Sequence, residues 1–227
     1  MLMRPLLFIG CFLLAIYSSF AKQTTLDINA KGQKLSLAFW PCEAKQQRGA
    51  ILLLAGSESW EGNVILLQLA PSLAKMGWSV AIFDLAKQTK WAEQLPDIFI
   101  ALKKGASQKI VLIHYGSHLQ ELIDYFSQLQ AKRVNGLVLL SAFDEKASEL
   151  NLKKIVFPIL DVIAQFDYET VKAQLKQRQS TALKGKYKKI TLPGASHDYL
   201  YYEKSLLALL HAWMCKLPET NRIANPL

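Results

Sequence analysis

The chain has 227 residues, which is enough for one well-buried domain and few for two. Hydrophobic residues make up 51% of it and charged residues 20%, which excludes a disordered or collagen-like chain. The formal net charge is +9, from 27 Lys and Arg residues against 18 Asp and Glu residues. No motif for nucleic-acid recognition accompanies this positive charge, so we predict that the chain does not bind nucleic acid.

The first residues are typical of a secretory signal peptide. Arg4 supplies a short positive region, residues 6–17 form an apolar run, and residues 19–21 read Ser-Phe-Ala, with small residues at the −3 and −1 positions of a cleavage site. The twelve apolar residues would extend about 18 Å as a helix, less than the roughly 30 Å of a bilayer core. We therefore predict cleavage after Ala21, a periplasmic or secreted protein, and one mature domain over residues 22–227.

Apolar, strand-like runs alternate with amphipathic helical stretches along the mature chain. In chain order we predict strands at 34–40, 50–55, 79–83, 109–114, 136–140, 155–164 and 187–192, and helices at 64–76, 91–104, 117–129, 168–183 and 203–216. The first strand alternates apolar and polar residues, which favours an antiparallel edge, whereas the next strands are continuously apolar. This order predicts a single α/β domain with a doubly wound, mostly parallel sheet and helices on both faces.

Polar residues gather in the loops that follow the predicted strands. In an open α/β sheet these loops meet at the carboxyl edge, where ligands bind. The loops 56–62, 84–90, 114–118, 164–167 and 193–198 carry Ser57, Glu58, Asp84, His114, Ser117, His118, Asp167, His197 and Asp198. We expect the functional site at this edge.

The order of these pieces resembles the α/β-hydrolase superfamily. The loop with Gly56 and Ser57 resembles the oxyanion side of the site, and KIVLIHYGSHLQ stands where the nucleophile elbow belongs. FPILDVIAQFD resembles the strand that delivers the acidic triad member, here Asp167, and KKITLPGASHDYL resembles the loop of the catalytic histidine, here His197. More narrowly, the chain resembles a branch of exported bacterial proteins defined only as a domain of unknown function.

The elbow departs from the G-x-S-x-G pattern of the superfamily. Residues 114–118 read His-Tyr-Gly-Ser-His, so Gly116 occupies the position of the nucleophile. Glycine tolerates the sharp turn, but it has no side chain that could attack a carbonyl carbon. Three interpretations stay open: the nucleophile has been lost, Ser117 acts in its place as it enters the next helix, or another serine such as Ser57 or Ser141 attacks.

The leading functional expectation is a binding or scaffolding protein of the bacterial envelope that takes a small molecule or an envelope component and needs no cofactor. The alternative is an esterase-like hydrolase that uses Ser117 with His197 and Asp167. Only about fourteen residues separate the strand that ends at Leu140 from the next predicted strand, which leaves no room for a lid domain and predicts an open pocket. The basic stretch from Lys172 to Lys189 would attract an anionic surface.

Two further groups of residues are candidates, one for a disulfide and the other for a metal site. Cys42 and Cys215 remain after cleavage, and both are expected near the amino edge of the sheet, so we predict a disulfide between them. His114, His118 and His197 would suit zinc if they converged. Because one ends a strand and the next enters a helix, their side chains should diverge, and we predict no metal site.

Overall fold

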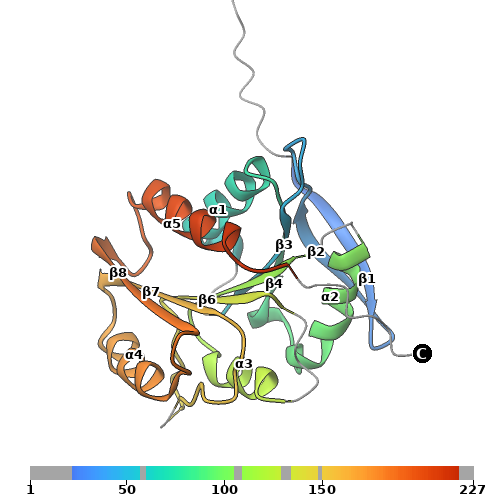
Figure 1. Ribbon diagram of the computed structural model, residues 1–227. Coiled ribbons are helices and arrows are strands. Elements are labelled where there is room, and N and C mark those ends of the chain that lie inside the picture. Colours follow the sequence, from blue (N-terminus) through green and yellow to red (C-terminus); the bar gives the residue numbers. More distant parts are fainter. Residues whose placement is uncertain (1–21, 57–59, 105–108, 129–133, 148–149, 220–227) are drawn as a thin grey trace, which may run out of the picture.

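The computed structural model describes residues 22–56, 60–104, 109–128, 134–147 and 150–219 (Figure 1). The expected signal peptide and Ser57 lie outside these residues, so the predictions made for them stay predictions. Within the described part of the chain, no helix combines the length and the hydropathy needed to cross a bilayer.

An eight-stranded sheet forms the centre of the molecule, in the order β1-β2-β4-β3-β5-β6-β7-β8. Its strands are β1 (Thr24–Ala30), β2 (Gln33–Trp40), β3 (Gly49–Ala55), β4 (Trp78–Asp84), β5 (Ile110–Tyr115), β6 (Gly136–Leu140), β7 (Ile159–Phe166) and β8 (Tyr187–Ser196). β2 pairs antiparallel with both β1 and β4, and the pairings from β4 through β8 are parallel. The predicted sheet and its antiparallel edge are confirmed, but the sequence analysis missed β1.

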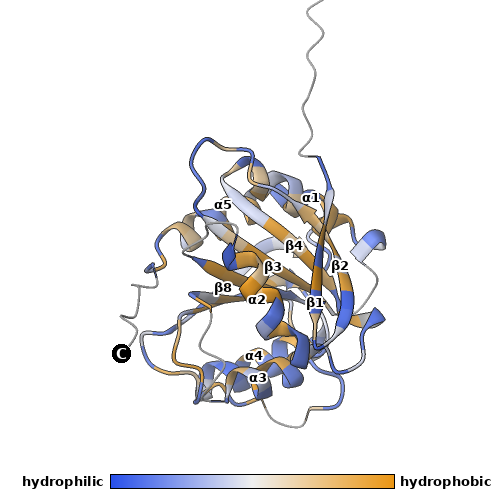
Figure 2. Cartoon of the chain, turned by 90° about the vertical axis from the view of Figure 1, so that its right-hand side faces the viewer, coloured by the Kyte–Doolittle hydropathy of each residue, from blue (hydrophilic) through white to orange (hydrophobic). Residues whose placement is uncertain are grey.

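Helices cover both faces of the sheet, as predicted (Figure 1). The α-helices are α1 (Val64–Lys75), α2 (Leu95–Lys104), α3 (Leu119–Phe126), α4 (Glu169–Thr181) and α5 (Glu203–Cys215), and short 3-10 turns lie at Trp60–Gly62, Leu85–Lys87 and Trp91–Gln94. α1 and α5 cover one face, and α2, α3 and α4 cover the other. The inner strands β3 and β4 are fully buried, and Figure 2 shows their hydrophobic character against hydrophilic outer loops.

The ends of β7 and β8 explain two features of the sequence. Pro158 directly precedes β7 and offers only its carbonyl, which accepts from the Leu137 N–H at 3.0 Å, so a proline is tolerated there. β8 is the edge strand, and its exposed Lys188 and Lys189 discourage pairing with another chain. Between β6 and β7 the described residues form no helix and no lid.

The predicted disulfide is not formed, and Cys42 and Cys215 are both free thiols. Cys42 Sγ lies 3.5 Å from the carbonyl oxygen of Ala44, and Cys215 Sγ lies 3.5 Å from His211 Nε2, one turn earlier in α5. Each sulfur therefore faces a neighbour on its own segment, and the predicted disulfide is wrong.

Candidate functional site

The turn between β5 and α3 has the shape of a nucleophile elbow. The strand ends at Tyr115, the helix begins at Leu119, and Gly116 between them has a φ of 84°. The Gly116 carbonyl accepts from the Phe143 N–H at 2.9 Å, which ties the turn to the loop after β6. A left-handed residue at this point is what a strand turning sharply into a helix requires, and glycine adopts that conformation without strain.

The start of α3 differs from the sequence prediction. The N-cap residue is His118, with a φ of 69° and no side-chain cap hydrogen bond, whereas Ser117 was expected to begin the helix. Ser117 is half-buried, and its backbone lies against Gly56 at the end of β3. The Gly56 N–H also donates to the Tyr115 carbonyl at 2.9 Å. The loop after β3, which was expected on the oxyanion side of the site, therefore starts at Gly56 in direct contact with the elbow.

Asp167 and His197, thirty residues apart in the chain, meet at the carboxyl ends of β7 and β8. His197 Nδ1 lies 2.6 Å from Asp167 Oδ1. The carboxylate side chain is fully buried, while 14% of the imidazole is exposed. With Asp167 ionised, the proton lies on Nδ1 and Nε2 is left as the acceptor, which is the orientation of a general base. The structure thus brings together the acid and the histidine that the resemblance implied.

Several donors compensate for the burial of the Asp167 carboxylate. Burial alone would raise its pKa, but hydrogen bonds from His197, Ser141 and the Ala164 amide outweigh burial and leave the pKa below the usual aspartate value. The Ala164 N–H donates to Oδ2 and the Tyr168 N–H to Oδ1, both at 3.0 Å. Asp167 is therefore held as a charged acceptor at neutral pH.

Aromatic rings surround the His197 imidazole. The Tyr168 ring stacks on it with 4.1 Å between ring centroids and 25° between planes. The Tyr115 and Phe143 rings lie at 5.6 and 6.1 Å from it. These contacts fix the ring plane and leave the imidazole edge facing a small cleft.

The cleft beside the imidazole has a volume of about 340 Å³. It is lined by Gly62, Asn63, Val64, Tyr115, Phe143, Tyr168, His197, Asp198 and Leu200. A larger hollow of about 430 Å³ lies between α1 and α5, but its lining contains neither Asp167 nor His197. Of these two hollows, only the 340 Å³ cleft adjoins the acid–histidine pair, and it has room for a small molecule.

The other two histidines of the elbow do not join this cleft as a metal site. His114 is completely buried, and burial, with smaller contributions from His118 and Arg178, lowers its pKa to about 3. His118 is partly exposed, with Nδ1 3.4 Å from Glu121 Oε1. Across the described residues, His, Cys, Asp and Glu side chains form no cluster of three or more that could hold a metal ion.

Two residues of the site were not anticipated in their roles. Ser141 appeared in the sequence analysis only as a possible nucleophile, and Tyr199 was not considered. The Ser141 hydroxyl is fully buried, donates to Asp167 Oδ2 and lies 2.6 Å from the Tyr199 hydroxyl. Both hydrogen bonds of the hydroxyl lie inside the fold, and Ser141 does not line the cleft. The interpretation that Ser141 attacks a substrate is therefore wrong.

Solved structures share this architecture. The esterase domain of a Rhodothermus marinus protein superposes with a TM-score of 0.68 at 12% identity, over 86% of this chain and 99% of that one. Dienelactone hydrolase from Anabaena variabilis gives 0.68 at 13% identity, over 86% and 98%. An α/β serine hydrolase without lid from Xanthomonas campestris gives 0.62 at 16% identity, over 88% and 97%. No protein-family model and no curated protein matches the sequence.

The strand order, the elbow and the acid–histidine pair define the chain as an α/β-hydrolase-fold protein. Within that fold it has the lidless form, because the described residues between β6 and β7 contain no helix.

Proposed function

We propose that this protein has lost the nucleophile of the hydrolase fold and binds a small molecule in the cleft beside His197. The observation that carries the proposal is Gly116, which has the left-handed φ of 84° at the elbow and no side chain to attack a carbonyl carbon. A general base without a nucleophile supplies typically about 10²–10⁴-fold, far below the acceleration of a complete enzyme.

The lining of the cleft indicates the kind of ligand. Val64, Phe143 and Leu200 offer apolar contact, and Tyr168 presents an aromatic surface that is 56% exposed. The His197 imidazole supplies a polar edge at the same cleft, whereas the Asn63 side chain caps α1 by accepting from the Leu66 N–H. This combination suits a small ligand with an apolar or aromatic part and one hydrogen-bonding group. We propose that the protein acts in the bacterial envelope, because residues 1–21 have the pattern of a secretory signal peptide.

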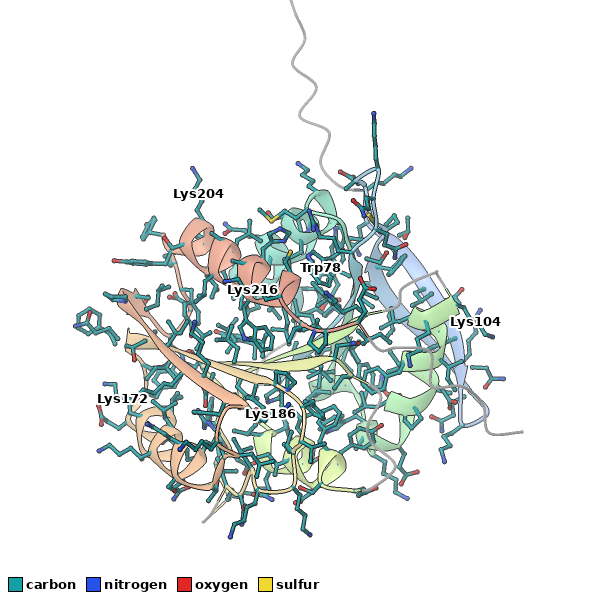
Figure 3. The ribbon with its side chains drawn as sticks, in the orientation of Figure 1. Trp78, Lys104, Lys172, Lys186, Lys204 and Lys216 are labelled. Carbon is teal, nitrogen blue, oxygen red and sulfur yellow. The ribbon has the colours of Figure 1, made fainter. Side chains whose placement is uncertain are left out.

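The basic stretch adds a second, weaker feature to the proposal. Arg178 is buried, so it does not contribute to the surface charge. Lys172 on α4 lies at the left margin of the molecule in Figure 3, and Lys186, Lys188 and Lys189 are exposed before and on the edge strand. We propose that this face adds a salt-sensitive attraction to anionic envelope surfaces.

The alternative is an esterase-like hydrolase in which Ser117 attacks with help from His197. It is favoured by one observation, the intact hydrogen bond between His197 Nδ1 and Asp167 Oδ1. A protein that only binds a ligand does not need a general base, although the same pair also shapes the wall of the cleft.

Turnover of short acyl esters separates the two functions. We expect the wild-type protein and its Ser117→Ala variant to show the same background hydrolysis. Binding is measured in parallel by thermal shift with a panel of small aromatic and acyl compounds. A compound that occupies the cleft should raise Tm in the wild type and in Lys172→Ala, but not in His197→Ala. Turnover that Ser117→Ala abolishes would establish the esterase instead.

A further inference from the structure

Ser141 has a strained backbone at the point where β6 ends. Its φ is 43°, a conformation that side-chain-bearing residues rarely adopt, and the residue is fully buried. The Ser141 N–H donates to the Val162 carbonyl at 2.9 Å, which continues the pairing of β6 with β7. Strain of this kind persists only where the surrounding structure holds it, and it concentrates at functional sites.

The strained conformation places the Ser141 hydroxyl between two buried oxygens. Asp167 Oδ2 can only accept, so the single hydroxyl proton of Ser141 goes to the carboxylate. The Ser141 oxygen then accepts from the Tyr199 hydroxyl, 2.6 Å away, whose proton is shared with the Val162 carbonyl at 3.1 Å. Burial raises the pKa of Tyr199 well above its usual value, so this phenol stays protonated and remains a donor.

Tyr199 is held as tightly as Ser141. It is completely buried and also left-handed, with a φ of 55°. Its N–H donates to the Ser196 carbonyl at 2.9 Å, in the turn that carries His197. The loop that delivers the histidine and the strand end that delivers Ser141 therefore meet at one carboxylate, that of Asp167.

We infer that Ser141 and Tyr199 are positioning residues, which form a buried relay from phenol to hydroxyl to carboxylate that holds Asp167 ionised and aimed at His197. Donors to a carboxylate stabilise its charged form, and linked hydrogen bonds strengthen one another in a buried setting. The inference goes beyond the proposed function, because the relay sets the state of Asp167 and His197 whether the cleft binds a ligand or cleaves one.

The experiment uses two nuclear magnetic resonance signals of the folded protein. One is the carboxyl carbon of Asp167, followed through an acid titration. The other is the low-field Nδ1 proton of His197, which is visible only while its hydrogen bond to Asp167 persists. Ser141→Gly and Ser141→Ala both remove the hydroxyl, but only glycine also relieves the strained φ. Both should raise the Asp167 titration midpoint by about one pH unit and broaden the Nδ1 proton.

A second pair of variants keeps the test independent of folding losses at Ser141. Tyr199→Phe removes one link of the relay and should shift both signals in the same direction by a smaller amount. Tyr201→Phe is the matched control, because Tyr201 is also left-handed with a φ of 68° but is 87% exposed. It should change neither signal. An unchanged midpoint and Nδ1 proton in folded Ser141→Gly and Tyr199→Phe would overturn the inference. Neither signal depends on ligand binding or turnover, so the outcome for the relay can be told apart from the outcome for the proposed function.

Discussion

Gly56 and Ser117 lie so close together that a side chain at residue 56 has no space. A Cβ on Gly56 would overlap the carbonyl oxygen of Ser117 and lie 2.8 Å from its backbone nitrogen. Because these are backbone atoms of the elbow, they cannot rotate away as a flexible side chain could. The loop after β3 and the elbow after β5 therefore hold each other in place.

Gly56→Ala should destabilise the fold by about 1–3 kcal/mol, the usual cost of overpacking a close contact. Gly62→Ala is the control, since a Cβ there meets nothing within 4 Å. The free energy of unfolding from urea titration measures both. Equal stability of the two variants would show that the two loops can separate at little cost.

Breaking the buried ion pair between Arg178 and Asp161 should lower the free energy of unfolding by more than Gly56→Ala does. Arg178 Nε lies 2.6 Å from Asp161 Oδ2, Nη1 donates to the Ala142 carbonyl at 3.1 Å, and the Tyr187 hydroxyl also donates to Asp161 at 2.6 Å. Arg178→Met leaves the Asp161 carboxylate uncompensated in the interior, which should cost about 3–5 kcal/mol of unfolding free energy.

Two further variants show whether this loss comes from the stranded charge. Lys172→Met breaks the exposed pair with Glu169 and should change stability by less than about 1 kcal/mol. Adding Asp161→Leu to Arg178→Met should recover part of the loss, because the unpaired charge is gone. A double variant less stable than Arg178→Met alone would refute this explanation.

The buried His114 should make the free energy of unfolding depend on pH in the acid range. A histidine in the unfolded chain titrates near 6.5, whereas burial lowers the pKa of His114 in the fold to about 3. Between these values the unfolded chain binds one more proton than the folded one. The free energy of unfolding should therefore fall by a few kcal/mol as pH drops from 6.5 to 3, with no further contribution from this residue below that range.

Unfolding at several pH values between 7 and 4 measures this contribution. His114→Leu should lose less stability on acidification than the wild type. His118→Gln removes the partly exposed histidine of the same turn and should follow the wild-type slope much more closely. Parallel pH profiles for the wild type and His114→Leu would show that His114 is protonated in the fold.

The sequence was sufficient for those parts of the structure that depend on local pattern. Continuous apolar runs predicted the buried parallel strands, such as β3, β4 and β5. The order of the loops also brought Asp167 and His197 together, since the carboxyl ends of parallel strands share one edge.

The missed features depend on tertiary contacts or on small distances. β1 is an exception, because Leu26, Ile28 and Ala30 alternate with polar residues and already carry the pattern of a half-buried strand. Ser141 and Tyr199 lie 58 residues apart, and nothing in either neighbourhood indicates a shared carboxylate. The predicted disulfide is not formed, and each sulfur instead lies beside a neighbour on its own segment, a local contact that the sequence pattern does not indicate.

Gly116→Ser is the substitution that tests the proposed loss of the nucleophile. It places a hydroxyl at the left-handed position of the elbow, in the fold that also holds the Asp167–His197 pair. We expect a small loss of stability, about 1–3 kcal/mol from the strained φ, and a slow ester cleavage that the wild type lacks. The ester cleavage should disappear again when His197→Ala is added.

Reaction with a fluorophosphonate probe, read by intact mass and by mapping of the modified residue, tests the loss of the nucleophile at Gly116. We expect no adduct on the folded wild-type protein or on Ser117→Ala. We expect one adduct on the introduced serine of Gly116→Ser, and none when His197→Ala is combined with that substitution. An adduct on Ser117 of the wild-type protein that depends on His197 would overturn the proposed loss, because it would show that an active nucleophile has been kept one residue beyond Gly116.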